Sequence, residues 1–176
     1  NEEINEGLVR FDIVFYVRMK DGLSQIIINV EAQKDEPTGY EILNRAIFYV
    51  SRLISSQKER DFENSSYDDI KRVYSIWVCM NMDESSMSHV HLTKEDLIGS
   101  YEWKGNLDLL NIIMLGLAKN LPEHDETYEL HRLLGALLSK ELTIDEKLNI
   151  IGNEYDIPIE ENFRKDVSVM CNLSQG

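Results

Sequence analysis

The chain has 176 residues, of which 43% are hydrophobic and 28% charged, with 9 glycines and 3 prolines. This composition excludes collagen-like, low-complexity and broadly disordered chains and predicts one globular domain with at most a small appendage. The formal net charge of −14 opposes nonspecific nucleic-acid binding. Residues 1–80 carry 10 basic and 14 acidic side chains, whereas residues 81–176 carry 8 and 18, so a site for a polyanion is expected in the first half.

The sequence contains no signal for export or for a membrane. No run approaches the roughly 18 consecutive apolar residues that a membrane span needs, and the acidic start is unlike a signal peptide. Cys79 and Cys171 lie far apart, which disfavours a disulfide scaffold or a cysteine-built zinc site. We therefore expect a cytoplasmic protein with reduced thiols and no membrane partner.

The first predicted element is a β-hairpin. Residues 8–18 and 24–33 are rich in β-branched and aromatic side chains and flank the turn signal Asp21-Gly22. With these two residues at the centre of a type I′ turn, the numbers of facing residues sum to 43, and Asp12 faces Glu31. Strand alternation predicts two faces, a core face with Ile26, Ile28, Val30 and Ala32 and the face of Asp12 with Ile27, Asn29, Glu31 and Gln33.

A helix and a buried strand are predicted next. Apolar residues recur at helical spacing over residues 40–57, and Arg45, Tyr49 and Arg52 form a polar stripe beside them. Residues 73–80 form a near-continuous apolar run, which predicts a strand buried on both faces, with Trp77 in the core. This strand is expected to join the hairpin in one sheet.

The middle of the chain is harder to interpret. Residues 58–69 and 82–88 are predicted to be loops, and residues 90–98 are ambiguous, with Thr93 as a candidate start of a short helix. Residues 107–118 fit either a buried strand or a core helix, and we favour the strand.

Helices are predicted for the remainder. Residues 128–138 place leucines on one helical face, Thr143 and Glu146 form a capping box that opens a helix to about Glu154, and a last helix covers about 160–171. Packing on the core is the favoured role of the leucine-rich helices, and a dimer surface is the alternative.

Two facing carboxylates repel one another unless positive charge lies between them. A divalent metal ion held by Asp12 and Glu31 would supply that charge, and oxygen ligands suit Mg²⁺ or Mn²⁺. The alternative from the residues alone is an exposed pair without function.

The order of Asp12, then Glu31-Ala32-Gln33 at the end of the next strand, then a helix resembles the PD-(D/E)XK family transposases, relatives of the recombination-promoting nucleases. Further similarity lies in residues 3–17, 26–40, 45–57, 73–81 and 170–176. The resemblance implies an α/β restriction-endonuclease-like core, a mixed sheet flanked by helices, in residues 1–122, followed by an acidic helical region in 123–176. It also implies a helix and a strand before Asp12, which lies too close to the start of the sequence for either.

The resemblance also implies roles for individual residues. Asp12, Glu31 and Gln33 are the implied catalytic residues, and Asp12, Glu31 and the Ala32 carbonyl the implied metal ligands. Gln33 stands where the family usually has lysine; it can hydrogen-bond water or phosphate but carries no charge. The implied activity is Mg²⁺-dependent (or Mn²⁺-dependent) hydrolysis of DNA in bacterial transposition or recombination. The alternative, favoured by Gln33 and the net charge, is a nuclease fold that binds nucleic acid or protein without turnover.

For Arg45, Tyr49 and Arg52 the residues alone favour a solvated helix face, and the resemblance favours contacts to DNA phosphates. His89 and His91 are interpreted as surface loop histidines rather than a metal-binding pair. His124 and His131 receive no role because the sequence identifies no acidic partner for them. DNA is thus the expected partner, and a homodimer is a further possibility that the sequence does not decide.

Overall fold

The computed structural model describes residues 13–18, 25–33, 37–58 and 66–173. For residues 13–18, 25–31 and 170–173 it describes the backbone alone. Asp12 and the hairpin turn lie outside the described residues.

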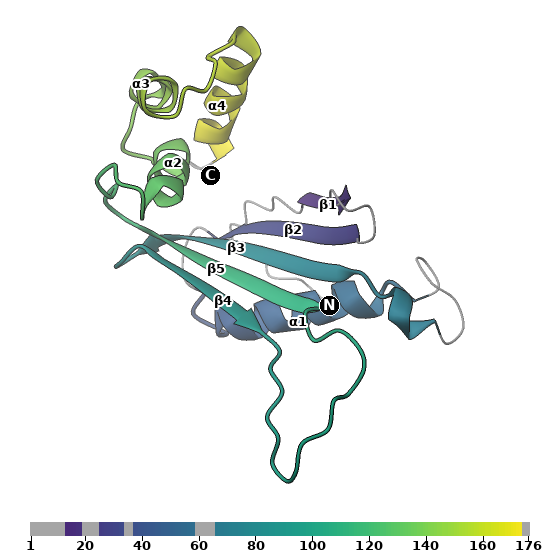
Figure 1. Ribbon diagram of the computed structural model, residues 1–176. Coiled ribbons are helices and arrows are strands. Elements are labelled where there is room, and N and C mark those ends of the chain that lie inside the picture. Colours follow the sequence, from purple (N-terminus) through teal and green to yellow (C-terminus); the bar gives the residue numbers. More distant parts are fainter. Residues whose placement is uncertain (1–12, 19–24, 34–36, 59–65, 174–176) are drawn as a thin grey trace.

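A five-stranded mixed sheet forms the centre of the molecule, in the order β1-β2-β3-β5-β4 (Figure 1). The parallel strands β2, β3 and β5 occupy the middle, and β1 and β4 pair antiparallel at the two edges. The strands are β1 (Ile13–Arg18), β2 (Gln25–Gln33), β3 (Arg72–Met82), β4 (Ser86–His91) and β5 (Leu110–Ala118). This mixed sheet, flanked by helices, confirms the predicted restriction-endonuclease-like α/β fold.

The register between β1 and β2 follows the hairpin rule. Every described pair, from Ile13 with Val30 to Arg18 with Gln25, has residue numbers that sum to 43. The register predicted from the turn signal is therefore confirmed for β1 and β2, up to one residue short of Asp12.

Helix α1 (Ile42–Ser55) covers one face of the sheet, as the apolar spacing predicts. Ala46 and Val50 are fully buried against Trp77 and the neighbouring strand residues Val73 and Ile112. The buried Gln57 side chain, just after the helix, exchanges two hydrogen bonds with the backbone of Lys71, with N···O distances of 3.0 and 2.8 Å. These bonds fix the end of α1 to the start of β3.

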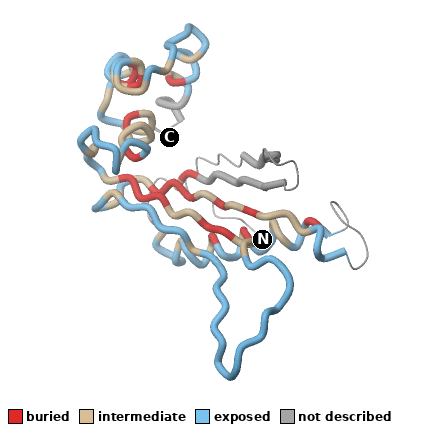
Figure 2. The backbone as a smooth tube through the Cα atoms, in the orientation of Figure 1, coloured by how far each residue is buried: buried red, intermediate tan, exposed pale blue. Residues whose placement is uncertain are grey.

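The other face of the sheet is covered at one end by α2 (Glu129–Leu138). Leu134 and Leu138 pack on a second cluster that consists of Val78, Leu115 and Leu117. Strand β3 is therefore buried on both faces, as predicted, and the favoured packing of the leucine-rich helices on the core is confirmed for α2 (Figure 2).

Between β3 and β5 one prediction is wrong, and one segment that the sequence left ambiguous is now assigned. Residues Ser86–His91 form strand β4 where a loop was expected, so His89 and His91 lie on an edge strand. Residues 92–109 contain no helix at Thr93 and form a long loop. The β4 sequence has little strand character, and its backbone pairs because β5 offers a free row of hydrogen-bonding groups. The preferred assignment of a strand near residues 107–118 is confirmed by β5, and a short 3₁₀ turn, η1 (Tyr67–Asp69), lies in the loop expected before β3.

Helices α3 (Ile144–Glu154) and α4 (Glu161–Leu173) complete the described chain. The predicted capping box is present: the Thr143 hydroxyl accepts from the Glu146 N–H, and the Glu146 carboxylate accepts from the Thr143 N–H. The buried Lys147 ammonium donates to the carbonyls of Leu137 and Ser139 at the end of α2, where the helix dipole favours a cation. The helices of the described part of the chain are too short or too polar to span a bilayer.

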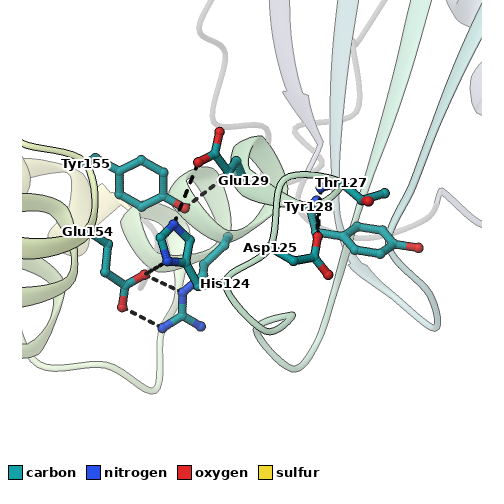
Figure 3. A network of polar contacts seen from close by, with 8 residues as sticks. His124, Asp125, Thr127, Tyr128, Glu129, Glu154 and Tyr155 are labelled. Atoms are coloured by element: carbon teal, nitrogen blue, oxygen red, sulfur yellow. Dashed lines mark hydrogen bonds and ion pairs between the residues drawn. The ribbon is translucent and has the colours of Figure 1, made fainter.

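A polar network holds α2 against the end of α3. The Arg132 guanidinium donates two hydrogen bonds to the Glu154 carboxylate, with N···O distances of 2.6 and 2.8 Å, and a third to the Pro122 carbonyl. His124, which received no role from the sequence, lies between Glu129 and Glu154 (Figure 3), with nitrogen–oxygen distances of 3.8 and 4.0 Å. This histidine therefore has acidic partners, contributed by helices that only the fold brings together.

We predict that Glu154→Gln lowers the free energy of unfolding at pH 7 by about 1–2 kcal/mol, because a neutral amide weakens the two bonds from Arg132. The hydrogen bonds from Arg132 lower the pKa of Glu154 below its usual 4.5. A carboxylate with a lowered folded-state pKa stabilises the fold above the unfolded pKa and loses that contribution as the pH falls through the folded value. The difference between wild type and variant in urea unfolding should therefore shrink below pH 4.5, and a constant difference would contradict the charge-assisted pair.

We predict that Ile112→Ala lowers the free energy of unfolding by about 2–5 kcal/mol, because the side chain is fully buried under α1 and its removal leaves a cavity. Val169→Ala is the matched control, since Val169 is 55% exposed on α4, and it should change stability by less than about 0.5 kcal/mol. Urea unfolding of the two variants checks this difference, and equal effects would contradict the described core.

Candidate functional site

The carboxyl ends of the parallel strands meet at one edge of the sheet. Gln33 at the end of β2 pairs with Cys79 of β3, which in turn pairs with Gly116 of β5. In open α/β sheets, ligands bind outside the carboxyl ends of such strands. A pocket of about 80 Å³ opens here, and its lining includes Gln33 among the apolar side chains of Ile42, Met82 and Met114. The Gln33 amide thus supplies hydrogen-bonding groups to a small and mainly apolar pocket.

An arginine–aromatic cluster lies on the α1 face of the same strands. Arg45 Nη1 donates to Tyr40 Oη at 2.6 Å, and the guanidinium carbon lies 5.6, 5.3 and 5.6 Å from the ring centroids of Tyr40, Tyr49 and Trp77. Burial lowers the pKa of Arg45, but the hydrogen bonds and electrostatic contacts with the two tyrosines outweigh this, so the pKa lies above its ordinary value. Arg45 is therefore a permanent cation held in a defined position.

The cluster is next to the position of Glu31. The backbone of Trp77 is the register partner of Glu31, so the ring beneath the guanidinium belongs to the residue paired with the predicted carboxylate. The side chain of Glu31 lies outside the described part, as does all of Asp12. Ala32 is buried and pairs with Val78. The structure thus brings Gln33, Arg45 and the backbone of Glu31 to one region.

The other two predicted DNA-binding residues occupy the same side of α1. Tyr49 packs edge-on against Trp77, with ring centroids 6.2 Å apart. Arg52 is exposed, and its guanidinium lies 5.8 Å from the centroid of the Phe48 ring. The three side chains therefore differ in how far they are packed. Arg45 and Tyr49 pack against aromatic rings, whereas the Arg52 side chain is exposed and accessible to a ligand.

Among the described residues, no group of three or more histidine, cysteine, aspartate or glutamate side chains could hold a metal ion. His89 and His91 share a face of β4 with ring centroids 4.6 Å apart, and His89 Nε2 lies 2.7 Å from Asn111 Oδ1. His131, left without a role by the sequence, is buried with its Nε2 2.9 Å from the Ser86 carbonyl. His89 thus connects β4 to β5, and His131 connects α2 to β4.

A larger pocket, of about 540 Å³, lies on the α2 side of the sheet. Its lining combines Leu117 and Leu138 with Lys119, Lys140 and Glu141. None of the predicted site residues that the structure describes lines this larger pocket. Among the described residues, Met80 is the one that lines both pockets.

A sequence model of the PD-(D/E)XK nuclease family transposases matches residues 1–147. The chain belongs to this family. The match includes all five strands, α1 and α2 and ends inside α3. No curated protein and no solved structure matches the sequence. PD-(D/E)XK nucleases generally use divalent metals, which makes the strand that ends in Glu31-Ala32-Gln33 the region to test.

The sequence of this PD-(D/E)XK chain did not predict which aromatic rings pack around the Arg45 guanidinium. Tyr49 is one helical turn from Arg45 and was grouped with it, but Tyr40 lies before the helix and Trp77 lies on a strand 32 positions later. The signal in the sequence was the clustering of two tyrosines around one arginine. The contribution of Trp77 depends on how α1 crosses the sheet.

We predict that Arg45→Met lowers the free energy of unfolding by about 1–2 kcal/mol, because it removes the bond to Tyr40 and the contacts with three aromatic rings. Arg52→Met is the matched control and should cost less than about 0.5 kcal/mol, since Arg52 is exposed and lies over one ring only. Chemical unfolding followed by circular dichroism measures both values. Equal stability of the two variants would contradict a packed role for Arg45.

Proposed function

We propose that this protein is a divalent-metal-dependent DNA endonuclease that hydrolyses phosphodiester bonds with Asp12, Glu31 and Gln33. The observation that carries the proposal is the β1–β2 register, in which paired residue numbers sum to 43. Continued by one residue beyond the described strand, this register would pair Asp12 with Glu31. Strand alternation gives position 31 the same face as Gln33, so in this proposal Asp12, Glu31 and Gln33 would lie together at the carboxyl end of β2.

The proposed metal ligands are the carboxylates of Asp12 and Glu31 and the carbonyl of Ala32. Such hard oxygen donors fit Mg²⁺ or Mn²⁺. A bound ion of this kind lowers the pKa of a coordinated water and stabilises negative charge on the phosphate. In this proposal Gln33 holds the water or a phosphate oxygen by hydrogen bonds, where the family usually has a charged lysine.

Arg45, Tyr49 and Arg52 are the proposed DNA contacts. Helix α1 carries two arginines and no acidic residue, in a chain with a net charge of −14. The fixed cation of Arg45 beside the partner of Glu31 suits a phosphate close to the metal ligands, and the exposed Arg52 suits a neighbouring phosphate.

The proposed setting is transposition or recombination in the cytoplasm of a bacterial cell. Residues 1–122 would form the nuclease core and residues 123–176 the acidic helical region. The proposed partners are DNA and a second copy of this chain.

A binding module without turnover is the second candidate. It is favoured by the uncharged Gln33, which lines a pocket with mainly apolar side chains rather than a charged one. A nuclease fold that binds DNA or protein without cleaving it would tolerate this glutamine.

Cleavage of supercoiled plasmid in Mg²⁺ or Mn²⁺ tests the proposal. We predict that Glu31→Gln reduces cleavage at least about 100-fold because it removes one ligand charge. Glu126→Gln, the same change at an exposed loop position, should leave the rate unchanged. Gln33→Lys should raise the rate, since it adds the positive charge that Gln33 lacks.

Titration calorimetry with Mn²⁺ separates the two candidates. The nuclease requires Mn²⁺ binding that is weakened by Glu31→Gln and not by Glu126→Gln. A folded wild-type protein that neither binds Mn²⁺ nor cleaves, and that Gln33→Lys does not activate, would support the binding module.

A further inference from the structure

The loop between β4 and β5 extends far from the body of the protein. Residues 92–109, which we call the arm, leave the sheet on the side of α1 and return to it (Figure 1), and they contain no helix or strand. Residues 92–107 are exposed along their whole length (Figure 2). The arm therefore contributes little to the core of a single copy.

The arm presents large apolar side chains to solvent. Leu97 is 84% exposed, Ile98 99% and Trp103 76%, and Leu92, Tyr101 and Leu107 are each at least half exposed. Single exposed apolar residues are common, but a group of six within one loop is typical of an interaction surface.

Polar contacts within the arm hold its shape. The Lys94 ammonium donates to Asp96 Oδ1 at 2.8 Å and to the Tyr101 carbonyl at 3.0 Å, and Ser100 Oγ donates to Asp96 at 3.1 Å. The Tyr101 and Trp103 rings pack edge-on with centroids 4.9 Å apart. The polar groups thus bond to each other while apolar groups face outward, and such preorganisation reduces the entropy lost on binding.

We infer that the arm is the surface through which two copies of this chain associate. This inference rests on the proposed pairing of two copies and not on nuclease chemistry.

The charge of the arm favours protein over DNA. Its two lysines, Lys94 and Lys104, are outnumbered by four acids, Glu95, Asp96, Glu102 and Asp108. Lys94 is already paired with Asp96, and Asp108 with Arg72. An acidic surface is repelled by phosphates, so the apolar side chains are poorly placed to act as a wedge between bases.

The strand from which the arm leaves points to a second copy as the partner. Strand β4 is the last in the sheet, and among the described strands it pairs with β5 alone. Its sequence, SMSHVH, contains no lysine, proline or acid, the residues that usually prevent edge strands from pairing with other chains. Two such edges can pair antiparallel about a twofold axis, which closes the assembly at two copies.

The chain also offers a surface that can accept a partner's arm. Leu43 and Ile47 of α1 are 38% and 42% exposed, and at about 100° per residue they lie on the side of the helix away from Arg45. Helix α1 and the arm lie on the same side of the sheet (Figure 1). A twofold axis can therefore place each arm against the partner's α1, where the exposed Leu43 and Ile47 offer apolar contacts to the apolar side chains of the arm.

Sedimentation equilibrium of the full chain tests the inference. We expect the wild type to be a dimer, and Ile98→Asp combined with Trp103→Ser to be monomeric with unchanged circular dichroism, since both side chains are exposed. Val169→Asp, at a position on α4 that is 55% exposed, is the matched control and should stay dimeric.

The possible outcomes distinguish two claims: that the chain forms a dimer, and that the arm is the surface through which it does so. A wild-type monomer at all soluble concentrations would overturn both the arm surface and the proposed pairing of two copies. A dimer that survives the double substitution would overturn the arm surface alone. A wild-type monomer whose binding to duplex DNA is lost in the double variant would make the arm a DNA contact. Plasmid cleavage is measured separately, so an inactive nuclease leaves this test unaffected.

Discussion

Burial of Trp77 between β3 and α1 is the contact on which the candidate site depends. The ring is fully buried, and its N–H donates to the buried Ser75 hydroxyl at 2.9 Å. The backbone of Trp77 pairs with Glu31 on one side and Met114 on the other, so this residue fixes the register of three parallel strands. Its ring also supports Tyr49 and Arg45. A single side chain thereby links the strand of the predicted metal ligands to the orientation of the helix.

The parallel arrangement explains why polar and apolar groups meet at one edge of the sheet. A parallel pair needs a crossover, and α1 supplies it between β2 and β3, which returns the chain across the sheet with Arg45 over Trp77. At the same edge Gly116 permits a close approach of β4, because a Cβ there would lie 2.6 Å from Ser86 Oγ. The pocket at Gln33 lies where the three parallel strands end side by side.

Charge and apolar surface are divided between regions of the molecule. Helix α1 carries two arginines, one of them over Trp77 of β3, whereas the second half of the chain has ten more acids than bases. In the proposed function this asymmetry directs DNA towards α1 and away from the C-terminal helices. The arm leaves from the opposite edge of the sheet, next to β4, so the proposed pairing of two copies there would leave the β1–β2 edge open.

The sequence by itself determined the features that depend on neighbours along the chain. The turn at Asp21-Gly22 predicted the β1–β2 register, apolar spacing predicted α1, the long apolar run predicted β3, and Thr143 with Glu146 predicted the start of α3. Each of these signals lies within one hairpin or a few helical turns, where backbone geometry leaves few alternatives.

Only the tertiary structure decided the remainder. Strand β4 forms because β5 provides hydrogen-bonding partners, Arg45 is fixed by a tryptophan on a distant strand, and His124 meets Glu154 because α2 and α3 pack together. The exposure of the arm is likewise a property of the whole fold, since the same apolar residues would fit a core strand or helix. These features depend on contacts between residues far apart in sequence, and such contacts are set by the packing of the completed sheet rather than by any local pattern.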